Sequence, residues 1–240
     1  MKVIIIRHGD PDYSIDSLTE KGWKEAELLA DRICKLDVKQ FYCSPLGRAK
    51  DTASATLKRL GRTAEEKDWL REFHAPVIDP KSGNSRLPWD LMPAYWTEID
   101  ELFNKDKWYD TELMKSGDVK NEYMRVAKGI DDILAAHGYI RNGNRYTTEQ
   151  GNHDTIVLFC HLGVEFVMLS HILGLSPSVL WQHFFVAPTS VTTLITEERE
   201  KGEVAFRCQS VGDTSHLYVA DEPIAFSGRF CETFEDDTRH

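Results

Sequence analysis

The chain contains 240 residues, 41% of them hydrophobic, and carries a formal net charge of −10. This acidic balance excludes a global field that attracts nucleic acid or an anionic membrane, so a local cluster of cations must hold any anionic substrate. No segment approaches the ~20 apolar residues of a membrane span or resembles a secretory apolar region, and we expect a cytoplasmic protein with no nucleic acid or membrane partner.

The first predicted element is a buried strand at residues 3–6, which ends directly before Arg7, His8 and Gly9. Open α/β sheets place their chemistry at the carboxyl ends of parallel strands. A histidine there is a candidate nucleophile toward phosphorus, and a neighbouring arginine can bind two phosphate oxygens at once. The strand end therefore indicates a phosphate-handling site, although Arg-His-Gly by itself also occurs in ordinary turns.

A helix is predicted over residues 19–35, because Thr19 can cap its amino terminus. Its apolar side chains recur at helical spacing, at Trp23, Ala26, Leu29, Ala30 and Ile33. A second buried strand follows at residues 41–43 and completes a βαβ unit. The next helix, residues 48–60, begins just after this strand, so its amino terminus adds a favourable potential for an anion.

Residues 74 to about 120 interrupt this alternation with repeated proline and aromatic residues. The aromatic residues include Trp89, Tyr95, Trp96, Trp108 and Tyr109. We treat the segment as an insertion in a single domain, residues 1–240, because the length allows one substantial core. Loops of this length commonly form lids or binding loops. The same aromatic residues could equally form a satellite core, and the sequence leaves both interpretations open.

The second half of the chain resumes the α/β alternation. A helix is predicted at residues 120–137 and a polar surface connection at 141–153. A third buried strand, residues 156–160, leads into His161, and an apolar helix covers residues 164–173. Histidine therefore again follows directly on a strand end.

Near the carboxyl terminus, residues 191–195 and 204–208 predict an antiparallel hairpin. We interpret the charge run at residues 197–201 as its solvated turn. The expected fold is an α/β protein, a three-layer α/β/α sandwich with a mostly parallel sheet and an antiparallel edge.

The strand ends supply Arg7 with His8, Arg48 shortly after the second strand, and His161. If the strands are neighbours, two arginines and two histidines converge on one cationic site, for which a phosphate dianion is the natural occupant. Taken singly, Arg48 could be a surface helix residue and His161 a core histidine.

Several motifs in a fixed order resemble those of the histidine phosphatase superfamily, also called the phosphoglycerate mutase-like family. They are Arg7-His8-Gly9, Leu18-Thr19-Glu20-Lys21-Gly22, Ser44-Pro45-Leu46-Gly47-Arg48-Ala49, His161-Leu162-Gly163, Pro188-Thr189-Ser190-Val191 and Asp213-Thr214-Ser215-His216-Leu217. The resemblance spans nearly the whole chain apart from the aromatic insertion and the tail.

The resemblance implies a phosphomonoester hydrolase that needs neither a metal nor another cofactor and acts on a small phosphorylated metabolite. His8 would form a phosphohistidine that water then hydrolyses. Arg7, Arg48 and His161 would bind the phosphoryl oxygens, with His161 also counted among the catalytic residues. Positioning and charge would therefore supply most of the catalysis.

Glu72 is the candidate general acid, because it resembles the acidic residue that the family places after the second arginine motif. It stands in the apolar setting Trp69-Leu70-Arg71-Glu72-Phe73, where burial would keep a carboxyl group partly protonated. The alternative is a surface glutamate paired with Arg71.

Asp10 and Ser14 are candidates for substrate contact. Ser14 lies six residues past His8, where many family members carry a phosphate-binding asparagine. Asp10 could favour a substrate with a donor or positive group, or it could cap a turn before Pro11. His216 could line the site or brace a neighbouring loop, and the bracing role is preferred.

Two other functions remain open. A mutase would return the phosphoryl group to a second hydroxyl of its substrate, but the insertion is poor in the basic residues that a bisphosphate requires. A non-catalytic phospholigand-binding protein usually loses its nucleophile or acid, whereas this chain keeps His8 and Glu72.

Overall fold

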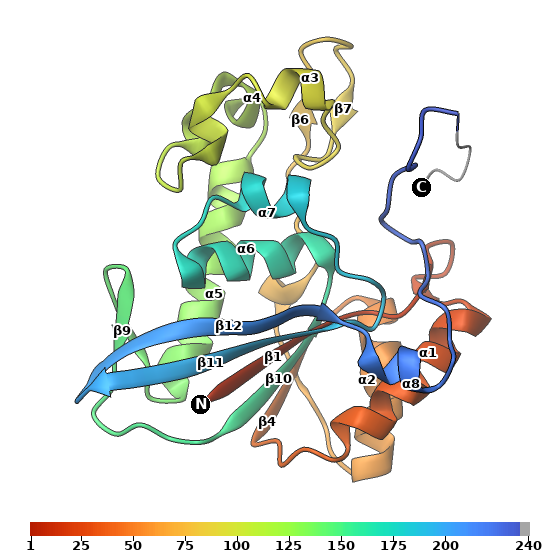
Figure 1. Ribbon diagram of the computed structural model, residues 1–240, viewed down its shortest axis with the longest axis vertical. Helices are drawn as coiled ribbons and strands as arrows, with labels where there is room; N and C mark the ends of the chain where they lie inside the picture. The colour runs from red at the N-terminus through yellow and green to blue at the C-terminus, as the bar shows by residue number, and fades with distance from the viewer. Residues whose placement is uncertain (236–240) are drawn as a thin grey trace.

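The computed structural model, which describes residues 1–235, is built on an eight-stranded mixed sheet (Figure 1). The strand order is β5-β4-β10-β1-β11-β12-β9-β8. These strands are β1 (Lys2–Arg7), β4 (Gln40–Cys43), β5 (Glu65–Glu66), β8 (Ile140–Asn142), β9 (Arg145–Thr147), β10 (Thr155–Cys160), β11 (Val191–Glu200) and β12 (Glu203–Asp213). Two small sheets join β2 (Pro11–Asp12) to β3 (Ser17–Leu18) and β6 (Val77–Ile78) to β7 (Ser85–Arg86).

The three predicted buried strands, β1, β10 and β4, lie side by side and run parallel. Their carboxyl ends lie at one level, since Phe159 of β10 pairs with both Ile6 of β1 and Cys43 of β4. Alternate side chains of β1 enter different cores: Val3 and Ile5 join one apolar cluster, and the residues between them join the other. A strand buried on both faces accounts for the continuous apolar run at residues 3–6.

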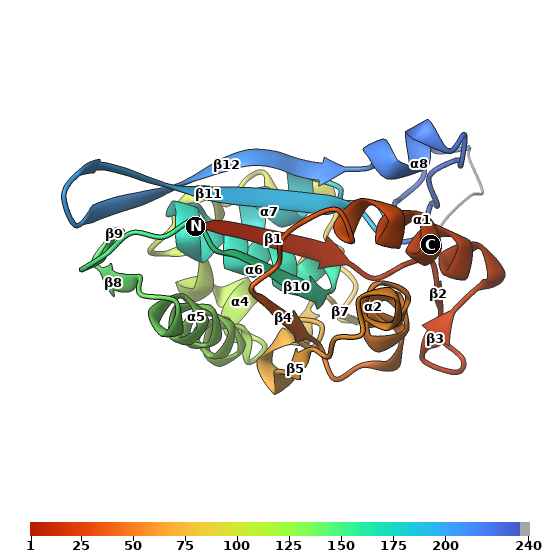
Figure 2. The same cartoon turned by 90° about the horizontal axis from the view of Figure 1, so that it is seen from below.

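Helices cover both faces of the sheet, which confirms the three-layer α/β architecture (Figures 1 and 2). One face carries α1 (Glu20–Ile33), α2 (Gly47–Leu60) and the short α8 (Ser215–Val219). The other carries α5 (Val119–Ala136), α6 (Leu162–Leu173) and α7 (Pro177–His183). Among the described residues, no helix is both long and apolar enough to cross a membrane.

The antiparallel part of the sheet is larger than the sequence predicted. Residues 141–153, expected as a surface connection, contain most of β8 and all of β9, and β9 pairs with β12. The charge run at 197–201 was also misinterpreted, because β11 continues through Glu200 and the turn consists of Lys201 and Gly202. Antiparallel strands can leave a face to water, so exposed charges need not end them.

Helix α1 begins as predicted, with the Thr19 hydroxyl accepting a hydrogen bond from the Gly22 N–H group. Its predicted apolar stripe was wrong at Trp23, which is 38% exposed. The buried stripe passes through Gly22 instead, where a Cβ atom would lie 2.2 Å from the Asp10 carbonyl oxygen. The backbone after His8 therefore packs directly on the helix at this glycine.

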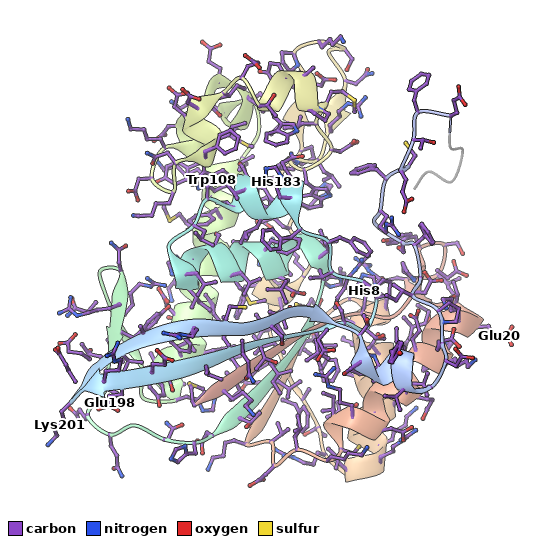
Figure 3. The ribbon with its side chains drawn as sticks, viewed as in Figure 1. His8, Glu20, Trp108, His183, Glu198 and Lys201 are labelled. Atoms are coloured by element: carbon purple, nitrogen blue, oxygen red, sulfur yellow. The ribbon has the colours of Figure 1, made fainter. Side chains whose placement is uncertain are left out.

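The insertion contains β6, β7, α3 (Pro93–Trp96) and α4 (Glu112–Lys115), and it lies beyond α6 and α7 (Figure 1). Two of its tryptophans, Trp96 and Trp108, are buried. The Trp108 ring lies 5.6 Å from that of Trp181 and 5.3 Å from that of Tyr123, centroid to centroid. In Figure 3, Trp108 of the insertion and His183 at the end of α7 both lie above His8. These two tryptophans are therefore core residues, and they belong to the main apolar cluster rather than to a separate satellite core.

Candidate active site

His8 follows β1 directly and is held by three backbone contacts. Its N–H group donates to the Cys160 carbonyl at 3.0 Å, and its own carbonyl accepts from the Thr189 N–H group at 3.1 Å. Its Nδ1 atom lies 2.7 Å from the Gly9 carbonyl oxygen. A carbonyl can only accept, so Nδ1 carries the proton and Nε2 keeps a free lone pair. This tautomer is the one a nucleophile needs.

The electrostatic setting keeps His8 uncharged. Burial holds the pKa of His8 well below its usual value, and the neighbouring guanidinium groups of Arg7 and Arg48 lower it further. His8 is 2% exposed. Because its pKa is lowered in this way, the imidazole is uncharged at neutral pH.

His161 occupies the corresponding place after β10, and its ring centroid is 5.1 Å from that of His8. Its Nε2 atom is hydrogen-bonded to the Ser44 hydroxyl at 2.7 Å. Its Nδ1 atom is buried and has no partner among the described residues. Burial lowers the pKa of His161 strongly, with smaller effects of His8 and Arg48. One ring nitrogen therefore remains available to a phosphoryl oxygen.

Arg7 ends β1 and is 2% exposed. Its Nη1 atom donates to the carbonyl oxygens of Val186 at 2.8 Å and Ser227 at 2.9 Å. Its Nε atom is buried without a partner in the described part of the chain. Burial lowers the pKa of this guanidinium, but an arginine in a protein stays charged. Arg7 thus brings a positioned cation with unused donor capacity.

Arg48 lies in the first turn of α2 and is paired with Asp16, Nη1 to Oδ1, at 2.6 Å. The other carboxylate oxygen of Asp16 accepts from the Gly47 N–H group at 2.7 Å. The guanidinium also lies 5.4 Å from the centroid of the Tyr13 ring, which is 66% exposed. The β2–β3 loop is therefore fastened to the start of α2, beside Arg48.

Glu72 sits at the amino terminus of α6. Its carboxylate accepts from the backbone N–H groups of Phe73 at 2.7 Å, Val164 at 3.0 Å and Gly163 at 3.3 Å. Desolvation raises the pKa of Glu72, in opposition to these hydrogen bonds. The predicted alternative, a pair with Arg71, does not occur: Arg71 pairs with Asp68 and Glu122.

The two substrate-contact candidates make their polar contacts elsewhere. The Asp10 carboxylate accepts from the Thr19 hydroxyl at 2.8 Å, at the start of α1. The Ser14 N–H and hydroxyl groups both bond to Asp12. Neither set of hydrogen bonds involves His8 or Arg48. The loop residues in contact with Arg48 are Asp16, through its carboxylate, and Tyr13, through its ring.

His216 braces the loop behind His8. Its Nε2 atom lies 3.2 Å from the hydroxyl of Thr189, whose N–H group bonds to the His8 carbonyl. Thr189 has a φ of 57°, an uncommon conformation for a β-branched residue. The contact supports the bracing interpretation of His216.

Sequence reasoning missed Ser44 and Thr52. The Thr52 hydroxyl accepts a hydrogen bond from the Gly9 N–H group at 2.9 Å and donates one to the Arg48 carbonyl at 2.7 Å. Thr52 therefore links the backbone next to His8 to the first turn of α2. Ser44 follows a buried strand as His8 and His161 do, and that position was the available signal. Within residues 1–235, no group of three His, Cys, Asp or Glu residues could hold a metal ion.

Comparison with known proteins gives a consistent result. A model of the histidine phosphatase superfamily (branch 1) matches residues 3–209. A probable phosphatase of Schizosaccharomyces pombe is 24% identical over 232 residues, 90% of this chain and 95% of that protein. A 2,3-bisphosphoglycerate-dependent phosphoglycerate mutase of Thermoplasma acidophilum is 42% identical over 166 residues, 65% of this chain and 80% of the mutase.

Solved structures show the same fold. A mycobacterial glucosyl-3-phosphoglycerate phosphatase superposes with a TM-score of 0.62 at 20% identity, covering 89% of this chain and 99% of that one. A phosphoserine phosphatase of Entamoeba histolytica gives 0.61 at 19% identity, covering 90% and 98%.

Proposed function

The chain belongs to the histidine phosphatase superfamily, and we propose that it hydrolyses monoesters of a small phosphorylated metabolite through a phosphohistidine. The observation that carries the proposal is the state of His8. Its Nδ1 proton is engaged by the Gly9 carbonyl, and its pKa is held low beside two arginines. The free Nε2 lone pair thus lies where a phosphate anion is attracted.

In the proposed first step, His8 Nε2 attacks phosphorus while the bond from phosphorus to the ester oxygen breaks. The electron pair goes to that oxygen, which takes a proton from Glu72 as the alcohol leaves. In the second step, the water oxygen attacks phosphorus while Glu72 takes a proton from that water and the phosphorus–nitrogen bond breaks. Phosphate departs, and both side chains regain their initial states.

Arg7, Arg48 and His161 are proposed to stabilise the transferring phosphoryl group. In the described part of the chain, the buried Nε atoms of both guanidinium groups and the Nδ1 atom of His161 have no hydrogen-bond partner, so they offer unused polar contacts to a phosphoryl group. Fixed donors of this kind need no reorganisation when charge develops. This arrangement suits a reaction whose catalysis consists mostly of positioning and charge.

A mutase would share the first step and differ in the second, where a substrate hydroxyl replaces water. The relative named as a mutase keeps this alternative open. The insertion argues for hydrolysis, because Arg86, its one arginine, is held by Asp79 at 3.2 Å and Asp90 at 3.1 Å. A second phosphate would have to displace these carboxylates. Isomerised product without free phosphate would identify a mutase.

The proposed setting is the cytoplasm, in which the five cysteines, all free in the structure, stay reduced. The insertion is proposed to belong to the same domain as the sheet, since Trp96 and Trp108 join the apolar cluster that contains Val3 and Ile5 of β1.

The test measures phosphate release from p-nitrophenyl phosphate and from an alkyl phosphate, with EDTA present. We expect no turnover for His8→Ala. Glu72→Gln should lose about 10²- to 10⁴-fold on the alkyl ester and less on nitrophenyl phosphate, whose leaving group needs little protonation. The exposed His153 provides a matched control as His153→Ala. A folded wild-type protein that releases no phosphate from either ester would overturn the proposal.

A further inference from the structure

Trp89 of the insertion differs from its buried neighbours because it touches the site itself. A Cβ atom on Gly163 would lie 2.5 Å from Trp89 Cη2 and 2.7 Å from Cζ3, and also 2.8 Å from Glu72 Oε1. The benzo edge of the indole and the carboxyl group of Glu72 are therefore close neighbours. The ring is partly exposed, unlike those of Trp96 and Trp108.

The indole is fixed in this place by other rings. Its centroid lies 5.6 Å from that of Trp181 and 6.4 Å from that of Phe73. Trp181 is anchored in turn, since its indole N–H donates to the Gly163 carbonyl at 3.1 Å. A ring held on two sides keeps its position when a ligand arrives, so it offers contact at a low cost in conformational entropy.

The charged groups beside Trp89 do not favour an anionic leaving group. Asp90 follows it directly and pairs with Arg86, which also pairs with Asp79. One guanidinium is thus shared by two carboxylates, and a substrate carboxylate would add a third negative charge. An uncharged apolar or aromatic surface meets no such opposition.

We propose that Trp89 sets the leaving-group preference of the enzyme, and that the alcohol released carries an uncharged aromatic or apolar face. This inference rests on the proposed function, because the alcohol must approach Glu72 to receive its proton. An ester oxygen at Glu72 brings the rest of the alcohol against the adjacent indole.

The experiment compares kcat/KM for benzyl phosphate, glycerol phosphate and phosphoserine, all alkyl esters that require protonation of the leaving oxygen. We expect benzyl phosphate to be preferred over the other two by about tenfold, the size of one favourable aromatic contact. Trp89→Leu should bring this ratio close to one, and Trp89→Phe should keep most of it. Phe103→Leu, at a 44% exposed aromatic residue of the same insertion, should leave it unchanged.

A binding measurement separates this inference from the hydrolase proposal. Benzylphosphonate and ethylphosphonate cannot be hydrolysed, and their dissociation constants for each variant can be measured by calorimetry, with inorganic phosphate as competitor. We expect benzylphosphonate to bind about tenfold more tightly than ethylphosphonate in the wild type and in Phe103→Leu, and this difference to disappear in Trp89→Leu. Thermal unfolding of each variant checks that the aromatic cluster still folds.

Equal binding of the two phosphonates, a wild-type preference for phosphoserine, or a benzyl preference unchanged in Trp89→Leu would each overturn the inference while hydrolysis stands. Tighter binding of benzylphosphonate without phosphate release from any ester would instead refute the hydrolase and support Trp89 as part of a ligand site.

Discussion

Gly163→Ala places one methyl group against Trp89 and Glu72, the two side chains that we propose to contact the leaving alcohol. The added carbon would lie 2.5 Å from Trp89 and 2.8 Å from Glu72 Oε1, closer than Cβ atoms approach the non-bonded heavy atoms of other residues. Trp89 is packed against Phe73 and Trp181, and Glu72 is held by three backbone N–H groups. We expect Glu72 to be displaced, because a single carboxyl group moves more easily than a packed indole.

The magnitudes predict a larger effect on activity than on stability. Alanine is favoured over glycine inside a helix by about 1 kcal/mol, whereas overpacking costs about 1–3 kcal/mol. The net loss of stability is then roughly 0–2 kcal/mol. Misplacing a catalytic group by about 1 Å costs on the order of 10²-fold in rate.

The assay is kcat/KM for benzyl phosphate and for p-nitrophenyl phosphate, together with the unfolding midpoint. The loss should be near 10²-fold for benzyl phosphate and smaller for the nitrophenyl ester, which depends less on Glu72. Gly61→Ala is the control: Gly61 ends α2 with a φ of 61°, and a Cβ atom there meets nothing within 4 Å. That variant should lose stability and keep its activity. Activity of Gly163→Ala within about threefold of wild type on both esters would refute the reasoning.

Three further outcomes are expected. Ser44→Ala leaves the buried Nε2 of His161 without its partner, which should cost about 1–3 kcal/mol of stability and lower kcat/KM; an unchanged urea midpoint would contradict this. Burial raises the pKa of Glu165 to about 8 from an ordinary 4.5, so the folded state is favoured below pH 4.5 and loses this stability as pH rises toward 8. The free energy of unfolding in urea should therefore fall by a few kcal/mol less between pH 5 and pH 8 for Glu165→Gln than for wild type. Equal falls would refute the raised pKa of Glu165. Nitrogen-15 NMR at pH 6.5 should show a neutral His161 in the free protein and a more protonated ring when phosphate is bound, because the dianion opposes the field of the two arginines. A ring unchanged by phosphate would contradict this reasoning.

The convergence of the candidate site residues could be predicted from the sequence because short-range rules place the strands that carry them. Apolar runs of three to five residues identify buried strands, and parallel strands that end at one level bring the following residues together. This reasoning reaches His8 and His161 without any knowledge of the intervening chain, and the same rule would have reached Ser44, which was missed. The resemblance then added Glu72, whose position depends on backbone contacts with α6.

The contacts that orient the two arginines could not be predicted. Arg7 bonds to the carbonyl of Ser227, 220 residues away, and backbone carbonyls leave no mark in the sequence. Asp16 reaches Arg48 because a loop with a φ of 48° at Asp16 packs on Gly47. The β8–β9 hairpin escaped detection for a related reason: its strands are polar and are fixed by pairing with β12 rather than by an apolar pattern.

In the candidate site, two arginines lie beside two histidines that are kept uncharged mainly by burial and further by these two cations. Arg7 and Arg48 lower the pKa of His8 and of His161, in addition to the effect of burial. A bound phosphate dianion opposes the field of both guanidinium groups at the same two rings. Its arrival therefore favours proton uptake at Nδ1 of His161, which has no partner within residues 1–235, while Nε2 of His8 is the atom proposed to attack phosphorus. Occupancy of the site, rather than the surrounding pH, then controls when His161 becomes a charged donor, and the low pKa of His8 keeps the proposed nucleophile unprotonated.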